Sequence, residues 1–154
     1  MVNSLAKLAL GGVVAITMLA LGGCAALPGE SARADVSHDD GYDEIAHTVR
    51  ATSSEFADVR IEDGVDGDET FLLVELDMTG DEVPGAALDA AMLALRETVP
   101  DTFDSVRVVA VSPSDDELEL EAPLAQTGVD GGLMIDPGTA SIPLDALRDM
   151  RILG

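Results

Sequence analysis

Apolar residues recur at every second position along three stretches of the chain, residues 56–62, 71–78 and 103–111, and in residues 57–62 they alternate with polar ones throughout. A period of two is typical of β-strands that have one face in a core. The shorter stretch 117–121, Glu-Leu-Glu-Leu-Glu, alternates in the same way and predicts a fourth strand with solvated glutamates. We place these alternating side chains in the core: Ala57, Val59, Ile61, Leu72, Val74, Leu76, Met78, Val106, Val108, Ala110, Leu118 and Leu120.

Helical periodicity replaces this alternation between Pro84 and Pro100. Apolar residues recur there with the spacing of a buried helical stripe, and proline suits the first position of a helix. Residues 42–54 predict a shorter helix with acidic residues in its first turn, and Pro143 is expected to start a last short helix. The stripe comprises Leu88, Ala91, Met92 and Leu95.

The turn-forming residues between these segments give an element order of α-β-β-α-β-β-α. Residues 63–68, Asp-Gly-Val-Asp-Gly-Asp, predict a longer loop that joins the first two strands as an antiparallel hairpin. Residues 128–138 are expected to form a loop with a short extended piece at 133–135. Mixed elements with hairpins indicate the α+β class. We expect a small antiparallel or mixed four-stranded sheet with helices on one face, as in a ferredoxin-like sandwich or a related fold.

Phe71 and Leu73 point away from the predicted core face of their strand. If helices cover one face of the sheet alone, these side chains form an exposed apolar patch, and such patches mark partner surfaces. The alternative that we favour is burial under the first helix or the C-terminal segment.

The N-terminus carries the three parts of a secretory signal. Lys7 provides a positive start, residues 8–21 are apolar apart from Thr17, and the segment ends in Leu21-Gly22-Gly23-Cys24. This ending resembles the lipobox of bacterial lipoproteins, an aliphatic residue and two small residues before a cysteine. The resemblance implies that a diacylglyceryl group modifies Cys24 and that a signal peptidase cuts between Gly23 and Cys24.

The lipobox therefore divides the chain into a signal peptide (residues 1–23), a lipidated cysteine with a flexible tether (24–41) and one domain (42–154). It implies a cell-membrane protein whose lipid-anchored domain lies on the extracytoplasmic side. One alternative is an uncleaved transmembrane helix, because the apolar run extends from Leu8 to Leu27 and approaches the length of a membrane span. Its glycine pairs weaken that helix.

The charge of the chain is strongly negative, with 30 acidic against 8 basic residues and a net charge of −22. Such a surface repels nucleic acid and anionic lipid headgroups, so we expect no nucleic-acid partner. Three explanations of the acidity stay open: the composition of a lysine-poor proteome, adaptation to salt, and binding of divalent cations. Cys24 is the only cysteine, which excludes an intrachain disulfide.

The best candidate for a cation site is the acidic loop with Asp63, Asp66, Asp68 and Glu69. Closely spaced carboxylates with intervening glycines suit Ca²⁺, although the spacing does not match an EF-hand loop. A solvated acidic turn accounts for the same residues. We therefore expect no required cofactor and keep Ca²⁺ as an alternative.

Catalytic signatures are weak in this sequence. His47 and Ser53 lie near each other along the chain, but no glycine-rich elbow or nucleotide-binding motif accompanies them. We therefore assign no catalytic residue and expect a protein that is not an enzyme. The domain is only weakly similar to small actinobacterial lipoproteins of uncharacterised function. The expected role is accessory binding or scaffolding of an envelope protein; the alternatives are a Ca²⁺-binding or sensing module and a small envelope hydrolase.

Overall fold

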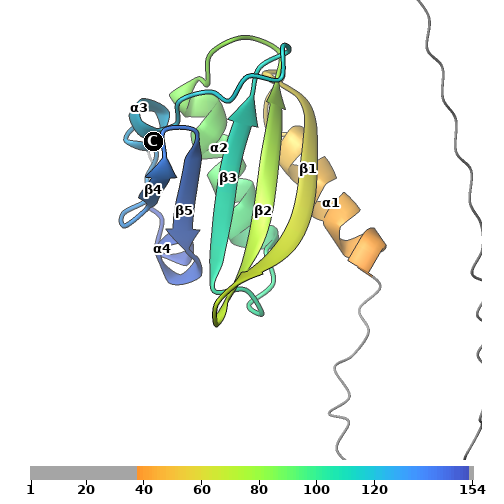
Figure 1. Cartoon of the computed structure of the whole chain (residues 1–154), viewed down its shortest axis with the longest axis vertical. Coiled ribbons are helices and arrows are strands. Elements are labelled where there is room, and N and C mark those ends of the chain that lie inside the picture. The colour runs from red at the N-terminus through yellow and green to blue at the C-terminus, as the bar shows by residue number, and fades with distance from the viewer. Residues whose placement is uncertain (1–37, 153–154) are drawn as a thin grey trace, which may run out of the picture. The chain divides into compact units, whose positions relative to one another are not determined.

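Five strands form one mixed sheet in the part of the chain that the structure describes, and four helices lie against one face of that sheet (Figure 1). The structure is a computed structural model that describes residues 38–152. Its elements follow in the order α1 (His38–Arg50), β1 (Phe56–Asp66), β2 (Glu69–Met78), α2 (Gly85–Thr98), β3 (Ser105–Val111), α3 (Glu121–Leu124), β4 (Leu133–Asp136), β5 (Thr139–Pro143) and α4 (Leu144–Arg148).

The strands lie in the order β1-β2-β3-β5-β4, so β1 and β4 form the two edges of the sheet (Figure 1). Strands β2 and β3 are parallel and are joined by the crossover helix α2, whereas every other neighbouring pair is antiparallel. The predicted α+β class is confirmed. The four-stranded sheet is not confirmed. The strand order also differs from a ferredoxin-like sandwich: here β2 and β3, the two strands of the β-α-β unit, are direct neighbours, whereas in that fold another strand lies between them.

A two-residue turn, and not a longer loop, joins β1 to β2. Asp66 pairs with Glu69, so the hairpin closes over Gly67 and Asp68. Gly67 has a φ of +64°, which suits the first central residue of a type II′ turn, where glycine meets no steric penalty. The predicted loop was wrong because the polar residues 63–66 continue the strand, and β1 therefore reaches 11 residues.

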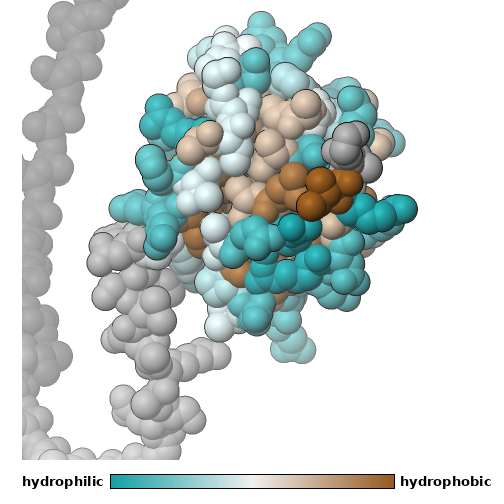
Figure 2. Space-filling view, turned by 180° about the vertical axis from the view of Figure 1, so that it is seen from behind, coloured by the Kyte–Doolittle hydropathy of each residue, from teal (hydrophilic) through white to brown (hydrophobic). Residues whose placement is uncertain are grey.

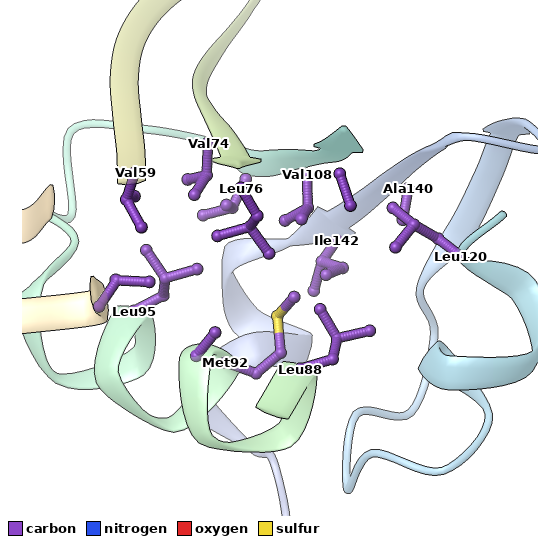
Figure 3. Packing of buried hydrophobic residues seen from close by; sticks show 14 of the residues in the cluster. Val59, Val74, Leu76, Leu88, Met92, Leu95, Val108, Leu120, Ala140 and Ile142 are labelled. Carbon is purple, nitrogen blue, oxygen red and sulfur yellow. The ribbon is translucent and has the colours of Figure 1, made fainter. Parts of the chain in front are cut away.

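The core lies between the helices and the sheet (Figure 3). Inward side chains of β2 and β3 meet α2, and each fully buried aliphatic side chain contributes about 1.5–3 kcal/mol. The predicted core residues are buried or half-buried there, except Ala57, which is exposed because the register of β1 shifts between Phe56 and Asp58. Fully buried members include Leu72, Val74, Leu76, Leu88, Met92, Leu95, Val106, Val108, Ile142 and Leu147.

The predicted strand at 117–121 was wrong. Glu117 forms only an isolated bridge to Val111, and α3 starts at Glu121. Leu120 is nevertheless fully buried, because an irregular segment crossing the core can also alternate inward and outward. Sheet pairing is made instead by β4, near the predicted extended piece, and by β5, whose residues Ala140 and Ile142 enter the core.

The helix boundaries agree best where proline marks them. Pro84 and Pro143, predicted as the first residues of their helices, cap them instead, so α2 starts one residue later at Gly85 and α4 at Leu144. Helix α1 starts at His38 and ends at Arg50, so residues 38–41, predicted as part of the tether, are helical, and residues 51–54, predicted as helix, are not.

Candidate functional site

The four residues of the predicted cation loop lie apart from one another in the hairpin. Asp63 pairs with Leu72, whose side chain is buried under the helices, and therefore lies on the helical side of the sheet. Asp66 and Glu69 pair with each other and lie on the open side, while Asp68 is exposed in the turn. Within residues 38–152, no group of three or more Asp, Glu, His or Cys side chains is arranged to hold a metal ion.

Asp63 is joined to α1 through Tyr42. Partial burial of Tyr42 and its hydrogen bond to the Asp63 carboxylate both raise the pKa of the tyrosine hydroxyl. A carboxylate that accepts a hydrogen bond from a neighbouring helix fastens β1 to that helix. Asp63 therefore attaches β1 to α1, which is a structural role.

Asp66 and Glu69 surround an arginine of the neighbouring strand. The Arg107 guanidinium lies 2.8 Å from an Asp66 carboxylate oxygen and 3.9 Å from Glu69, and it stacks over the Phe71 ring at 3.8 Å from the centroid. Glu69 also accepts a hydrogen bond from Ser105. These contacts half-bury Phe71 on the open face, so neither predicted environment of this ring was correct.

A groove of about 490 Å³ lies between α1 and the outer edge of β1. Helix α1 contributes the half-buried Tyr42 and Ala46 and the exposed His47, and β1 contributes Val59 and Ile61. The groove is open along its length because β1 is an edge strand whose outer side no described strand covers.

The charges around this groove are unevenly satisfied. Arg60 donates hydrogen bonds to Glu75 and, at 2.7 Å, to Asp77 of β2, and these carboxylates raise the pKa of its guanidinium. Arg50 lies 3.8 Å from Asp58. Glu62 has no ion-pair partner among the described residues and is exposed. The groove therefore presents unneutralised negative charge.

The outer edge of β1 carries main-chain hydrogen-bonding groups. Hydrogen-bonded and non-bonded pairs alternate along an antiparallel ladder, and the pair that closes a two-residue hairpin, Asp66 with Glu69, is a bonded one. Alternation then directs the N–H and C=O groups of Val59, Ile61 and Val65 away from β2. Among the described residues, no hydrogen bond from another element reaches these groups.

The helical side of the domain also carries apolar surface. Figure 2 shows this side, where hydrophilic residues surround a central area of apolar ones. We place the candidate site at the β1 edge because an edge strand borders a groove there.

No catalytic group of side chains is assembled among the described residues of this groove. The imidazole of His47 makes no hydrogen bond or ion pair with a described residue, and only its main-chain carbonyl accepts a bond, from the Ala51 N–H. The raised or lowered pKa values in the domain have structural causes at Tyr42, Arg60 and Asp104. The groove instead combines main-chain donors and acceptors, a small apolar wall and acidic side chains. This combination suits binding of a polypeptide.

Sequence reasoning missed this groove. The polar face of residues 56–62 was visible as alternation, but which strand forms an edge depends on the order of the whole sheet.

The predicted lipidation site Cys24 and cleavage site at Gly23 lie outside the described residues. No described helix is long and apolar enough to span a bilayer. No family model, curated protein or solved structure matches the chain.

Proposed function

We propose that this chain is a lipid-anchored extracytoplasmic protein that binds another envelope protein in an accessory or scaffolding role. The observation that carries the binding role is the open groove between α1 and β1, where an edge strand presents main-chain groups beside an acidic wall. Edge strands attract other strands unless they are covered or blunted. A long edge strand beside a groove is therefore suited to a protein partner.

The proposed anchor is Cys24, on the strength of the lipobox sequence at residues 21–24. Two acyl chains hold a protein stably on a bilayer, whereas one chain holds it only marginally. The net charge of −22 repels an anionic membrane surface. The domain would consequently stand away from the lipid, with the groove accessible to neighbouring proteins.

The experiment is cross-linking in intact cells with tagged protein, followed by purification and mass spectrometry. Cys24→Ser is the matched variant, because it removes the acylated thiol by a single atom change outside the described domain. We expect an envelope protein that cross-links to the wild type and is lost or strongly reduced with Cys24→Ser. Maturation of Cys24→Ser at the same site would contradict the lipobox assignment, and the absence of any anchor-dependent partner would contradict the accessory role.

A further inference from the structure

We infer that the outer edge of β1 accepts an extended, cationic segment of the partner as an additional strand of the sheet. This inference rests on the proposed binding role and deepens it by naming the chemistry of the partner. In β-strand addition, main-chain hydrogen bonds provide affinity and alternate side chains provide specificity. Both ingredients are present at the groove, since Val59, Ile61 and Val65 direct main-chain groups outward beside the wall of α1.

The side chains of β1 define what such a strand would carry on the open side of the sheet. Directly opposed residues of paired strands share one face, and opposite charges across the pair are favourable. Asp58 and Glu62 lie on the open side with Arg60 between them. Arg60 is already paired with β2, and Asp58 has a longer contact, 3.8 Å, with Arg50 of α1. The partner segment would thus place lysine or arginine opposite the two acids and an uncharged polar residue opposite Arg60.

The helical side of the added strand would meet a different surface. Ile61 is half-buried there, beside Tyr42 and Ala46 of α1, and Val65 is 70 % exposed. β-branched residues fit a pleated, half-buried surface of this kind. The matching segment therefore has valine-like residues at every second position, facing the helical side. The residues between them, facing the open side, are in order a cation, a neutral polar residue and a cation.

Charge favours this occupant over a second copy of the chain. Two copies that paired through β1 would bring together two domains of chains that each carry a net charge of −22, and like charges opposed across a strand pair are destabilising. A cationic partner gains from the same field.

The test uses the full chain in detergent and the peptide acetyl-Ser-Val-Lys-Val-Thr-Val-Lys-Val-Ser-amide as the probe. We expect saturable binding, and binding weaker by about tenfold or more when both lysines become glutamate. N-methylation of the valines would block the main-chain bonds to β1, with a loss of about five- to tenfold for each bond removed. N-methylation of the lysines and threonine, on the outer edge of the peptide, would be tolerated. Equal effects of the two methylation patterns would overturn the inference.

Ile61→Pro provides the matching change in the protein. Proline is tolerated on an edge strand where the lost N–H faces outward, so the variant should keep the β1–β2 pairing and lose peptide binding. Ile61→Val keeps the N–H and should bind as the wild type does. Unchanged binding by Ile61→Pro would contradict strand addition, and if Ile61→Pro does not fold, the two methylated peptides decide the question.

The outcomes separate this inference from the proposed function. If anchored wild-type protein cross-links to an envelope partner and Ile61→Pro does so equally well, the accessory role stands and the edge-strand inference fails. If no anchor-dependent partner exists but the purified protein still distinguishes the two methylated peptides, the groove binds strands and the proposed role at the envelope fails.

Discussion

The two edges of the sheet differ in length and surroundings. Strand β1 has 11 residues, with a register shift at its start between Phe56 and Asp58, and it borders a groove and carries alternating charges. Strand β4 has four residues, with a register shift between Met134 and Asp136. Pro137 follows β4 directly. Short strands, bulges and proline are the usual means by which proteins blunt an edge. Strand β4 is thus too short to offer a long edge, whereas β1 keeps the outward main-chain groups of Val59, Ile61 and Val65 beyond its register shift.

The two edges are also held differently. The β1–β2 hairpin is fixed by its tight turn, by the Asp63–Tyr42 contact and by the stack of Arg107 on Phe71. Strand β4 pairs with β5 alone in the sheet, and Met134 packs against the core. Changes that loosen β1 should consequently affect stability and peptide binding together, and equivalent changes beside β4 should affect neither strongly.

Gly64→Ala should have the largest effect on stability. A Cβ at this position of β1 would overlap the Phe71 ring, and overpacking costs about 1–3 kcal/mol. The control is Gly138→Ala beside β4, where the nearest atom is the flexible Glu117 carboxylate at 3.0 Å. Urea denaturation should show a clearly larger loss for Gly64→Ala, and equal losses would contradict the different packing of the two edges.

Gly67→Ala should have the next largest effect, because an alanine at a φ of +64° is strained by about 1–2 kcal/mol. No neighbouring atom lies within 4 Å of the added Cβ, so the loss would be a backbone effect. Gly80→Ala is the matched control, since its Cβ also meets nothing within 4 Å and it has no positive φ. The measurement is the midpoint of urea denaturation of each variant. Equal midpoints for Gly67→Ala and Gly80→Ala would argue against the tight turn.

Acid should weaken the attachment of β2 to the start of β3. Asp104 accepts hydrogen bonds from the Thr70 N–H at 2.7 Å and hydroxyl at 2.9 Å, and these bonds lower the pKa of its carboxyl. A lowered pKa in the folded state means that the contribution to stability is present above the unfolded value, about 3.9, and is lost as the pH falls through the folded pKa.

Asp104→Asn removes this titration. The wild type should therefore lose more stability than Asp104→Asn as the pH falls from about 5 to about 2, measured as thermal midpoints across that range. Parallel profiles for the two proteins would show that the Thr70 contacts carry no acid-dependent free energy.

Glu62→Gln should have the smallest effect on stability, within about 0.5 kcal/mol for an exposed side chain. Its effect should appear in binding: affinity for the cationic peptide should fall about two- to fivefold, the range of an exposed ion pair. Glu119→Gln, an exposed residue near β4, should leave that affinity unchanged. A similar loss with both variants would indicate attraction by overall charge and not by the β1 edge.

The sequence predicted the core well because burial leaves a local pattern. The stripe Leu88, Ala91, Met92 and Leu95 and the alternation of Leu72, Val74 and Leu76 place the same residues in the core as the structure does. Proline marked the starts of α2 and α4 for an equally local reason, its fixed φ and missing N–H. These elements needed no knowledge of distant residues.

Pairing and edges could not be predicted in this way. Strand β5 is five residues long between Gly138 and Leu144, too short for a clear period, and its place between β3 and β4 is set by long-range contacts. The groove combines Tyr42 of α1 with Ile61 of β1, and nothing local connects them. The cation site predicted from the acidic residues was not assembled, because alternation along β1 places Asp63 and Asp66 on opposite faces of the sheet.

Amide hydrogen exchange of the full chain in detergent, with and without the lysine peptide, tests the edge-strand account most directly. In the protein alone, the amides of Val59, Ile61 and Val65 should exchange fast, and those of Arg60 and Glu62 should be protected by pairing with β2. Peptide should slow exchange at the first three and leave Met134 of β4 unchanged. Protection of Val59, Ile61 and Val65 before peptide is added, or no change on its addition, would contradict the account.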